Sequence, residues 1–211
     1  MTGSPSGPTK PLRADAERNR AAILEAARRL LAANGLGVSL DDVAAEAGVG
    51  SATLYRRFAS REELASAVLE QQMSGYADRT EADLARSQHD PWGALESHTH
   101  HVAEQQVTDR AFAEVVASPS LGSETLRAHL DRTHRASRAI VRNAVAAGAV
   151  RPDLHPSDLL MLVQSVNGLI ATDADTAAEA WPRLVATFLA AWTVRGDDLP
   201  AVPAPWAERD E

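Results

Sequence analysis

Polar and basic side chains with the spacing of a nucleic-acid contact surface are concentrated in residues 39–61, SLDDVAAEAGVGSATLYRRFASR. Two short amphipathic segments meet there at Gly48, and the second ends in Thr-Leu-Tyr-Arg-Arg-Phe. Leu54 and Phe58 are four residues apart, so on a helix both can face one core. The opposite face then carries small, hydroxyl and guanidinium groups, which suit the major groove of duplex DNA.

Each residue type in this run has a physical reason to contact DNA. Small residues at the front of the second segment let its backbone approach the duplex, while hydroxyl and guanidinium groups bond to phosphate oxygens. Ser39 begins the first segment, where outward-pointing backbone N–H groups make a phosphate seat. The candidate contacts are Ser39, Ser51, Ala52, Thr53, Tyr55, Arg56, Arg57 and Arg61. The alternative is an ordinary helical hairpin with solvated arginines.

The net charge of −8 argues against a nucleic-acid partner until its distribution is considered. Residues 1–61 hold nine Lys and Arg against six Asp and Glu, whereas residues 62–211 hold twelve against twenty-three. Positive charge therefore gathers around the two-segment motif and its N-terminal arm, and the acidity belongs to the rest of the chain.

Apolar periodicity and turn signals predict an all-α protein of about nine helices, with no alternation typical of strands. The predicted helices are 15–33, 39–47, 51–58, 60–86, 91–107, 109–117, 123–147, 156–171 and 176–195. We expect a disordered arm (1–13), a helix-turn-helix domain (14–60), a larger helical domain for ligand binding and dimerisation (61–195) and a disordered tail (196–211).

The run over residues 23–64 resembles the DNA-binding domain of the tetracycline-repressor (TetR) family. The shared features are LEAA, the glycine after the first helix, VAxxAGV, TLYxxF and SxEEL. The resemblance implies an all-α homodimer whose three N-terminal helices read DNA and whose larger domain binds a small molecule. It assigns DNA contacts to the residues given above. The sequence departs from the family at Gly50, the N-cap of the third helix, where many members carry Ser or Thr. Gly50 remains a candidate contact through its backbone, but one phosphate-binding hydroxyl is missing.

The last two predicted helices carry more apolar residues than one side of a helix pair needs. The resemblance implies that they form a four-helix interface with a second copy, and the excess suits that role. One short helix also reads too few bases to be specific, which favours a dimer on a palindromic operator. The alternative is a thick core within one chain.

Three histidines and a glutamate are the strongest candidates for a metal site. His98 and His101 share a helix face, with His100 adjacent and Glu104 near by. One helix rarely supplies a complete site, so we predict histidines that are solvated or line a pocket, and no metal.

A small-molecule pocket is expected between the helices of the larger domain. Two amides on an otherwise apolar helix, Gln164 and Asn167, are the most suggestive, since buried amides need partners. The candidate lining is Met73, Trp92, Leu95, His98, Val102, Phe112, Leu130, His134, Met161, Gln164 and Asn167. Ordinary core packing is the alternative for each.

Several classes are excluded or disfavoured. Without cysteine there are no disulfides or thiolate metal sites, and no segment looks like a signal peptide or membrane span. No catalytic motif or cofactor signature is present, so an enzyme is not expected. We predict a cytoplasmic, ligand-responsive transcription regulator, a repressor released from its DNA operator by a small molecule. The rival class is a small-molecule binding or sequestering protein with a vestigial DNA-binding domain.

Overall fold

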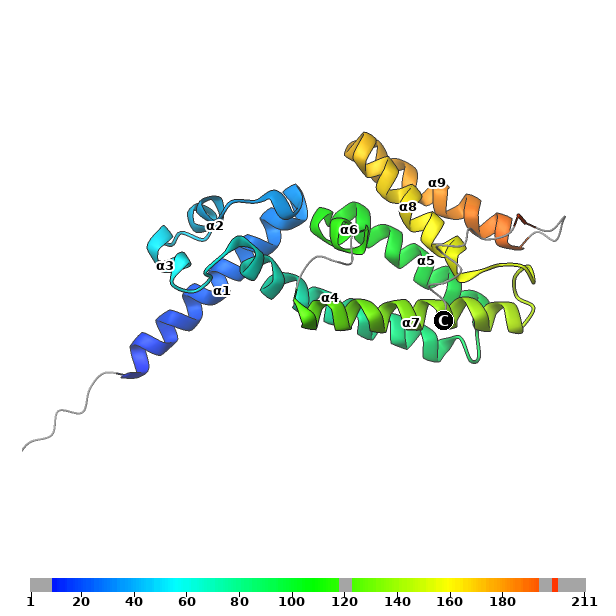
Figure 1. Ribbon diagram of the computed structural model, residues 1–211, viewed down its shortest axis with the longest axis horizontal. Helices are drawn as coiled ribbons and strands as arrows, with labels where there is room; N and C mark the ends of the chain where they lie inside the picture. Colours follow the sequence, from blue (N-terminus) through cyan, green and yellow to red (C-terminus); the bar gives the residue numbers. More distant parts are fainter. Residues whose placement is uncertain (1–8, 118–122, 194–198, 201–211) are drawn as a thin grey trace, which may run out of the picture.

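The computed structural model describes residues 9–117, 123–193 and 199–200, and within these ranges every regular element is helical. Figure 1 shows an elongated molecule in which α1–α3 occupy one end and α4 leads into a body made with α5–α9. The elements are α1 (Thr9–Asn34), the 3₁₀ turn η1 (Gly35–Gly37), α2 (Leu40–Glu46), α3 (Ser51–Tyr55), α4 (Arg61–Arg86), α5 (Pro91–Thr108), α6 (Arg110–Ala117), α7 (Glu124–Ala146), α8 (Pro156–Thr172) and α9 (Ala174–Thr193). The predicted fold class is confirmed.

Local capping signals set several of the helix starts. The side chains of Ser39, Ser60, Asp90 and Ser123 each accept a hydrogen bond from the backbone N–H three residues further on. Such a bond satisfies one of the N–H groups that a helix leaves unpaired in its first turn. The elements that follow these caps begin within one residue of the predicted positions.

The three N-terminal helices enclose a small apolar core to which Ile23, Val43, Leu54 and Phe58 contribute buried side chains. Gly48 turns the chain between α2 and α3 with φ +65°, a conformation that side chains with a Cβ rarely adopt. Regular α3 ends at Tyr55, earlier than predicted. The Phe58 N–H still donates to the Leu54 carbonyl at 2.9 Å, so a helix-like turn carries Phe58 into the core.

Helix α1 begins at Thr9 rather than at Asp15, so residues 9–13 of the predicted disordered arm are helical. Pro11 does not oppose this start, because the first turn of a helix needs no backbone N–H donors. Residues 1–8 of that arm lie outside the described residues, as does most of the predicted tail. Within the tail, the Leu199 N–H donates to Asp153 Oδ2 at 2.8 Å.

In the body, α7 runs alongside α4, and the α8–α9 pair packs against α5 (Figure 1). Arg132 of α7 bridges Asp78 at 2.8 Å and Glu81 at 2.7 Å, both on α4. These two ion pairs join α7 to α4. None of the described helices combines the length and hydropathy that crossing a bilayer requires.

Candidate DNA-contact surface and interior polar cluster

Helix α3 and the turn after it separate an apolar face from a polar one. Leu54 is fully buried and Phe58 nearly so, whereas the Tyr55 ring is 50% exposed. Tyr55 is one of two large apolar side chains that are exposed in the described part of the chain, so its ring and hydroxyl are available to a partner. The exposed candidates on this surface are Ser51, Ala52, Tyr55, Arg56 and Arg57, and Thr53 is half-buried at its edge.

Two guanidinium groups on this surface keep their charge available. Arg56 donates to Thr53 Oγ1 at 3.2 Å, and within the described part of the chain no ion pair involves Arg56 or Arg57. Arg61 lies 3.5 Å from Glu62, an exposed pair that water screens. Unpaired cations beside an exposed phenol can neutralise the phosphates of a nucleic acid.

The remaining two candidates have mainly structural roles in the isolated chain. The Ser39 hydroxyl caps α2, accepting from the Asp42 N–H at 3.1 Å and donating to Asp42 Oδ2 at 2.6 Å. Gly50 is the exposed N-cap of α3 and makes no side-chain bond there. A phosphate oxygen only accepts hydrogen bonds, so a phosphate contact by the Ser39 side chain requires its O–H to leave Asp42 Oδ2 and donate to the phosphate.

A group of polar side chains is buried inside the body, where sequence reasoning named only His98. Tyr76 of α4 and His98 and Gln106 of α5 are at most 4% exposed. His98 Nε2 lies 2.9 Å from the Ser137 hydroxyl of α7. Burial lowers the pKa of His98 to about 4 and raises the pKa of the Tyr76 phenol, so both groups are neutral near pH 7.

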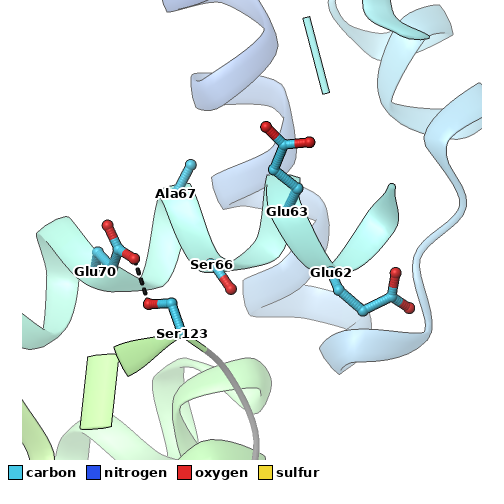
Figure 2. A pocket seen from close by; sticks show the side chains of 6 residues that line it. All are labelled: Glu62, Glu63, Ser66, Ala67, Glu70 and Ser123. Carbon is cyan, nitrogen blue, oxygen red and sulfur yellow. Dashed lines mark hydrogen bonds between the residues drawn. The ribbon is translucent and has the colours of Figure 1, made fainter. Parts of the chain in front are cut away.

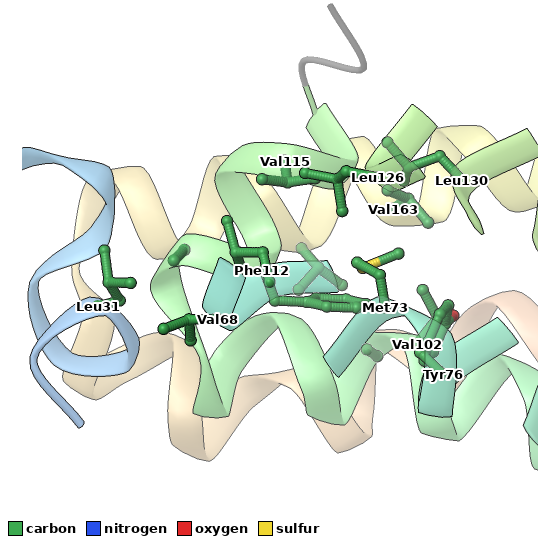
Figure 3. Packing of buried hydrophobic residues seen from close by; sticks show 14 of the residues in the cluster. Leu31, Val68, Met73, Tyr76, Val102, Phe112, Val115, Leu126, Leu130 and Val163 are labelled. Atoms are coloured by element: carbon green, nitrogen blue, oxygen red, sulfur yellow. The ribbon is translucent and has the colours of Figure 1, made fainter. Parts of the chain in front are cut away.

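The predicted pocket residues fall into three groups. Met73, Leu95, His98, Val102, Phe112 and Leu130 are buried in the body, and Trp92, His134, Met161 and Asn167 are half-buried. Gln164 is exposed, because the neighbours that turn α8 toward the core are Leu162, Val163 and Val166. We therefore remove Gln164 from the candidate lining. Figure 3 shows how Met73, Tyr76, Val102 and Phe112 pack together.

Asn167 pairs with Gln106, a residue that sequence reasoning missed. Gln106 Nε2 donates to Asn167 Oδ1 at 2.9 Å and to the Val163 carbonyl at 3.2 Å, joining α5 to α8. The missed signal was spacing: Gln106 lies eight residues after His98 on the same face of one helix.

The histidines do not converge on a common point. His98 contacts Ser137, while the His101 ring stacks on Tyr76 with a centroid distance of 5.2 Å, and Glu104 is exposed. No group of three or more acidic, histidine or cysteine side chains in the described ranges has the geometry of a metal site.

An open cavity of about 580 Å³, which the sequence did not predict, lies where α4 leaves the N-terminal helices (Figure 2). Its lining is Glu62, Glu63, Ser66, Ala67, Glu70 and Ser123. Three carboxylates repel phosphate, so this cavity does not belong to the DNA-contact surface. Glu70 instead accepts a hydrogen bond from the Ser123 hydroxyl and joins α4 to the start of α7.

Helix α6 packs against the turn after α1, and one hydrogen bond joins the two. Glu114 Oε2 of α6 accepts a hydrogen bond from the Leu36 N–H of η1 at 2.9 Å. Gly35 beside it has φ +74°, and a Cβ built there would lie 2.1 Å from Glu114 Oε1. Glycine thus permits both the left-handed turn and the close approach of the carboxylate.

Three N-terminal helices with an exposed polar α3, joined to a larger helical body, define a helix-turn-helix DNA-binding protein. The family model described as bacterial regulatory proteins, tetR family, matches residues 23–68, and the model described as transcriptional regulator SbtR-like, C-terminal domain, matches residues 90–190. The chain belongs to the TetR family of transcription regulators.

Solved structures of the same family share the fold. A TetR transcription regulatory protein from Mycobacterium vanbaalenii is 28% identical with a TM-score of 0.55, and the match covers 87% of this chain and 99% of that one. A TetR transcriptional regulator from Streptomyces coelicolor is 29% identical with a TM-score of 0.57, covering 84% and 99%. No curated protein sequence matches the chain.

Proposed function

We propose that this protein is a cytoplasmic one-component repressor that binds a palindromic operator as a homodimer and leaves it when a small molecule binds in the body. The observation that carries this proposal is the polarity of α3, with Leu54 buried while Tyr55, Arg56 and Arg57 face solvent. A helix anchored on one side and polar on the other can enter the major groove without losing its core.

The face of α8 and α9 that points away from the body supports dimerisation through these two helices. Leu184 and Phe188 of α9 are only half-buried, Trp181 keeps part of its ring exposed although it also meets His100 of α5, and Gly168 of α8 and Ala186 of α9 are exposed. Small residues let a second helix pair approach closely, and the half-buried rings supply apolar area to bury. Twofold pairing would place the two α3 helices about 34 Å apart, one turn of DNA.

Helix α6 connects the buried cluster to the DNA-binding domain. Phe112 of α6 packs edge-on against the Tyr76 ring at 4.9 Å, and Glu114, two residues later, holds the Leu36 N–H. A ligand that displaces Phe112 therefore shifts α6 and, through η1, the domain that carries α3. We propose this coupling, together with a tilt of α4, as the route from effector to operator release.

Selection of bound sequences from random duplex DNA tests this function. We expect a palindrome with half-sites one helical turn apart, bound with a steep salt dependence. Tyr55→Ala or Arg56→Ala should weaken that binding strongly and leave the dimer folded. Recovery of no preferred sequence would refute the proposal and favour a sequestering protein, whereas wild-type affinity in both variants would refute the assignment of these two contacts.

A further inference from the structure

Five buried polar side-chain atoms in the body have no hydrogen-bond partner among the described residues, and one of them, Asp83 Oδ2, lies 3.5 Å from the Arg79 guanidinium. The other four are Tyr76 OH, His98 Nδ1, Gln106 Oε1 and Asn167 Nδ2. Burying a polar group without a partner is costly, so native proteins normally satisfy such atoms with protein, water or ligand. Four of them in one interior call for a shared explanation.

The four atoms form two groups separated along α5. His98, Val102 and Gln106 follow each other at intervals of four residues on one face, and all three are buried. Eight residues of helix span about 12 Å. Tyr76 lies toward the His98 end, because its ring stacks on His101 and its phenol lies near Asp83. Asn167 lies at the Gln106 end, because the two amides share a hydrogen bond.

Apolar side chains occupy the space between the two groups. Val102 lies midway on α5, and the fully buried Met73 and Phe112 pack beside it (Figure 3). A ligand entering here must displace some of this packing, and the unbranched Met73 is the side chain that adapts at least cost. Binding therefore selects a second arrangement of the core, which suits a switch.

The hydrogen-bonding character of the Gln106 end is fixed by the backbone. Because Gln106 donates to the Val163 carbonyl, its Nε2 must point there and its Oε1 is the atom left over. Asn167 Oδ1 then has to accept from Gln106, which leaves Asn167 Nδ2 over. This end offers one acceptor and one donor, the complement of an amide or hydroxyl group.

The His98 end carries no unpaired charge. Burial lowers the pKa of His98 to about 4, with His101 and Arg79 adding to the effect, so the imidazole offers one hydrogen bond and no charge. Asp83 at this end accepts from the Ser97 hydroxyl at 3.2 Å through Oδ1, and its Oδ2, which accepts no hydrogen bond, lies 3.5 Å from Arg79. Because Arg79 balances the charge of Asp83, a charged ligand group would find no unpaired counter-ion.

We propose that the effector is an uncharged, elongated and mostly apolar molecule with a hydrogen-bonding group at each end, about 12 Å apart. One end bonds to Tyr76 and His98, and the other, an amide or hydroxyl, bonds to Gln106 and Asn167. Only the regulatory role of this ligand rests on the proposed function. The binding site itself rests on the buried polar atoms.

Calorimetric titration of the full-length protein with matched ten-carbon probes tests the ligand class. We expect 10-hydroxydecanamide to bind roughly three- to tenfold more tightly than decanamide, which lacks one end group. The charged 10-aminodecanamide and 9-carboxynonanamide should bind more weakly than either. Equal or tighter binding of a charged probe, or no binding of 10-hydroxydecanamide up to its solubility limit, would overturn the proposal.

Variants assign the two ends. In Tyr76→Phe, 10-hydroxydecanamide should lose its advantage over decanamide, while Gln106→Met should weaken both probes alike. Thr99→Val is the matched control, because the Thr99 hydroxyl is buried but already donates to the Leu95 carbonyl. An unchanged preference in Tyr76→Phe would mean that buried water satisfies these atoms and would overturn the assignment.

The same protein preparation should be tested on the duplex recovered by DNA selection, so that the two proposals fail separately. Specific DNA binding without binding of any probe would refute the ligand class and leave the repressor standing. Probe binding with the expected variant pattern but no preferred DNA would refute the repressor and leave the site standing.

Discussion

Glu114 and Leu36 are 78 residues apart in sequence and are joined by a 2.9 Å hydrogen bond from the Leu36 N–H to the Glu114 carboxylate. The bond links α6, which carries Phe112 into the buried cluster, to the turn that ends α1. Arg110 lies 3.4 Å from the same carboxylate and helps to orient it. One side chain thus connects the interior of the body to the domain that presents α3.

Glu114→Ala should free the Leu36 amide, whereas Glu114→Gln keeps a carbonyl oxygen that can accept from it. Since one such bond is worth about 1 kcal/mol, we expect exchange of the Leu36 amide to quicken roughly fivefold in the alanine variant. Hydrogen exchange followed by NMR or mass spectrometry measures this. Equal exchange rates in the two variants would show that the carboxylate does not hold the turn.

Gly35→Ala should destabilise the protein by about 1–3 kcal/mol, because alanine is strained at φ +74° and its Cβ displaces the Glu114 carboxylate. Gly37→Ala is the matched control in the same turn, where an added Cβ meets nothing within 4 Å. Urea unfolding of the two variants gives the comparison. A Gly35→Ala variant as stable as Gly37→Ala would contradict the strain argument.

The DNA-binding domain could be predicted closely because its signals are local. Ser39 and Ser60 cap helices through the N–H three residues on, Gly48 supplies the left-handed turn, and Leu54 with Phe58 sets the buried side of α3. Each of these depends on residues within four positions of one another, so no knowledge of tertiary contacts was needed.

The interior cluster could be predicted only in part, because helical periodicity shows which residues share a face but not which neighbour that face meets. Gln164 and Asn167 are both amides on α8, yet Asn167 meets Gln106 while Gln164 faces solvent. Likewise nothing near Glu114 in the sequence indicates a contact with η1. Such pairings depend on how helices far apart in sequence cross.

Stability should fall as pH is lowered from 7 to 5, and His98 should cause much of the fall. Its folded-state pKa of about 4 lies below the value of about 6.5 expected when unfolded, so the unfolded chain takes up the proton first. The free energy of unfolding therefore decreases as the pH falls from 6.5 toward 4. At pH 5 the decrease is about 2 kcal/mol.

Urea unfolding at the two pH values checks the effect of His98. His98→Gln should flatten the pH dependence, and His89→Gln, at an exposed position, should preserve it. If His98→Gln loses as much unfolding free energy between pH 7 and pH 5 as the wild type, then His98 is not a buried neutral imidazole.

Arg56→Ala and Arg57→Ala should each reduce the salt dependence of operator binding. Removing one phosphate contact per copy takes away two contacts in a dimer, so the slope of log K against log salt should become shallower by about two. Arg142→Ala, exposed on α7 in the body, serves as the control and should keep the wild-type slope. Fluorescence anisotropy across a salt series measures it, and an unchanged slope in both variants would remove these residues from the contact surface.

Gly168→Arg should convert the dimer into a monomer. An added Cβ at Gly168 of α8 or at Gly75 of α4 meets nothing within 4 Å, so a single folded chain accommodates arginine at either position. Both changes also replace a helix glycine with a better helix former, which makes their effects on folding comparable. Only Gly168 lies on the proposed interface, where arginine would insert charge and bulk between two copies. Analytical ultracentrifugation should therefore give a dimer for Gly75→Arg and a monomer for Gly168→Arg; a dimeric Gly168→Arg would place the interface elsewhere.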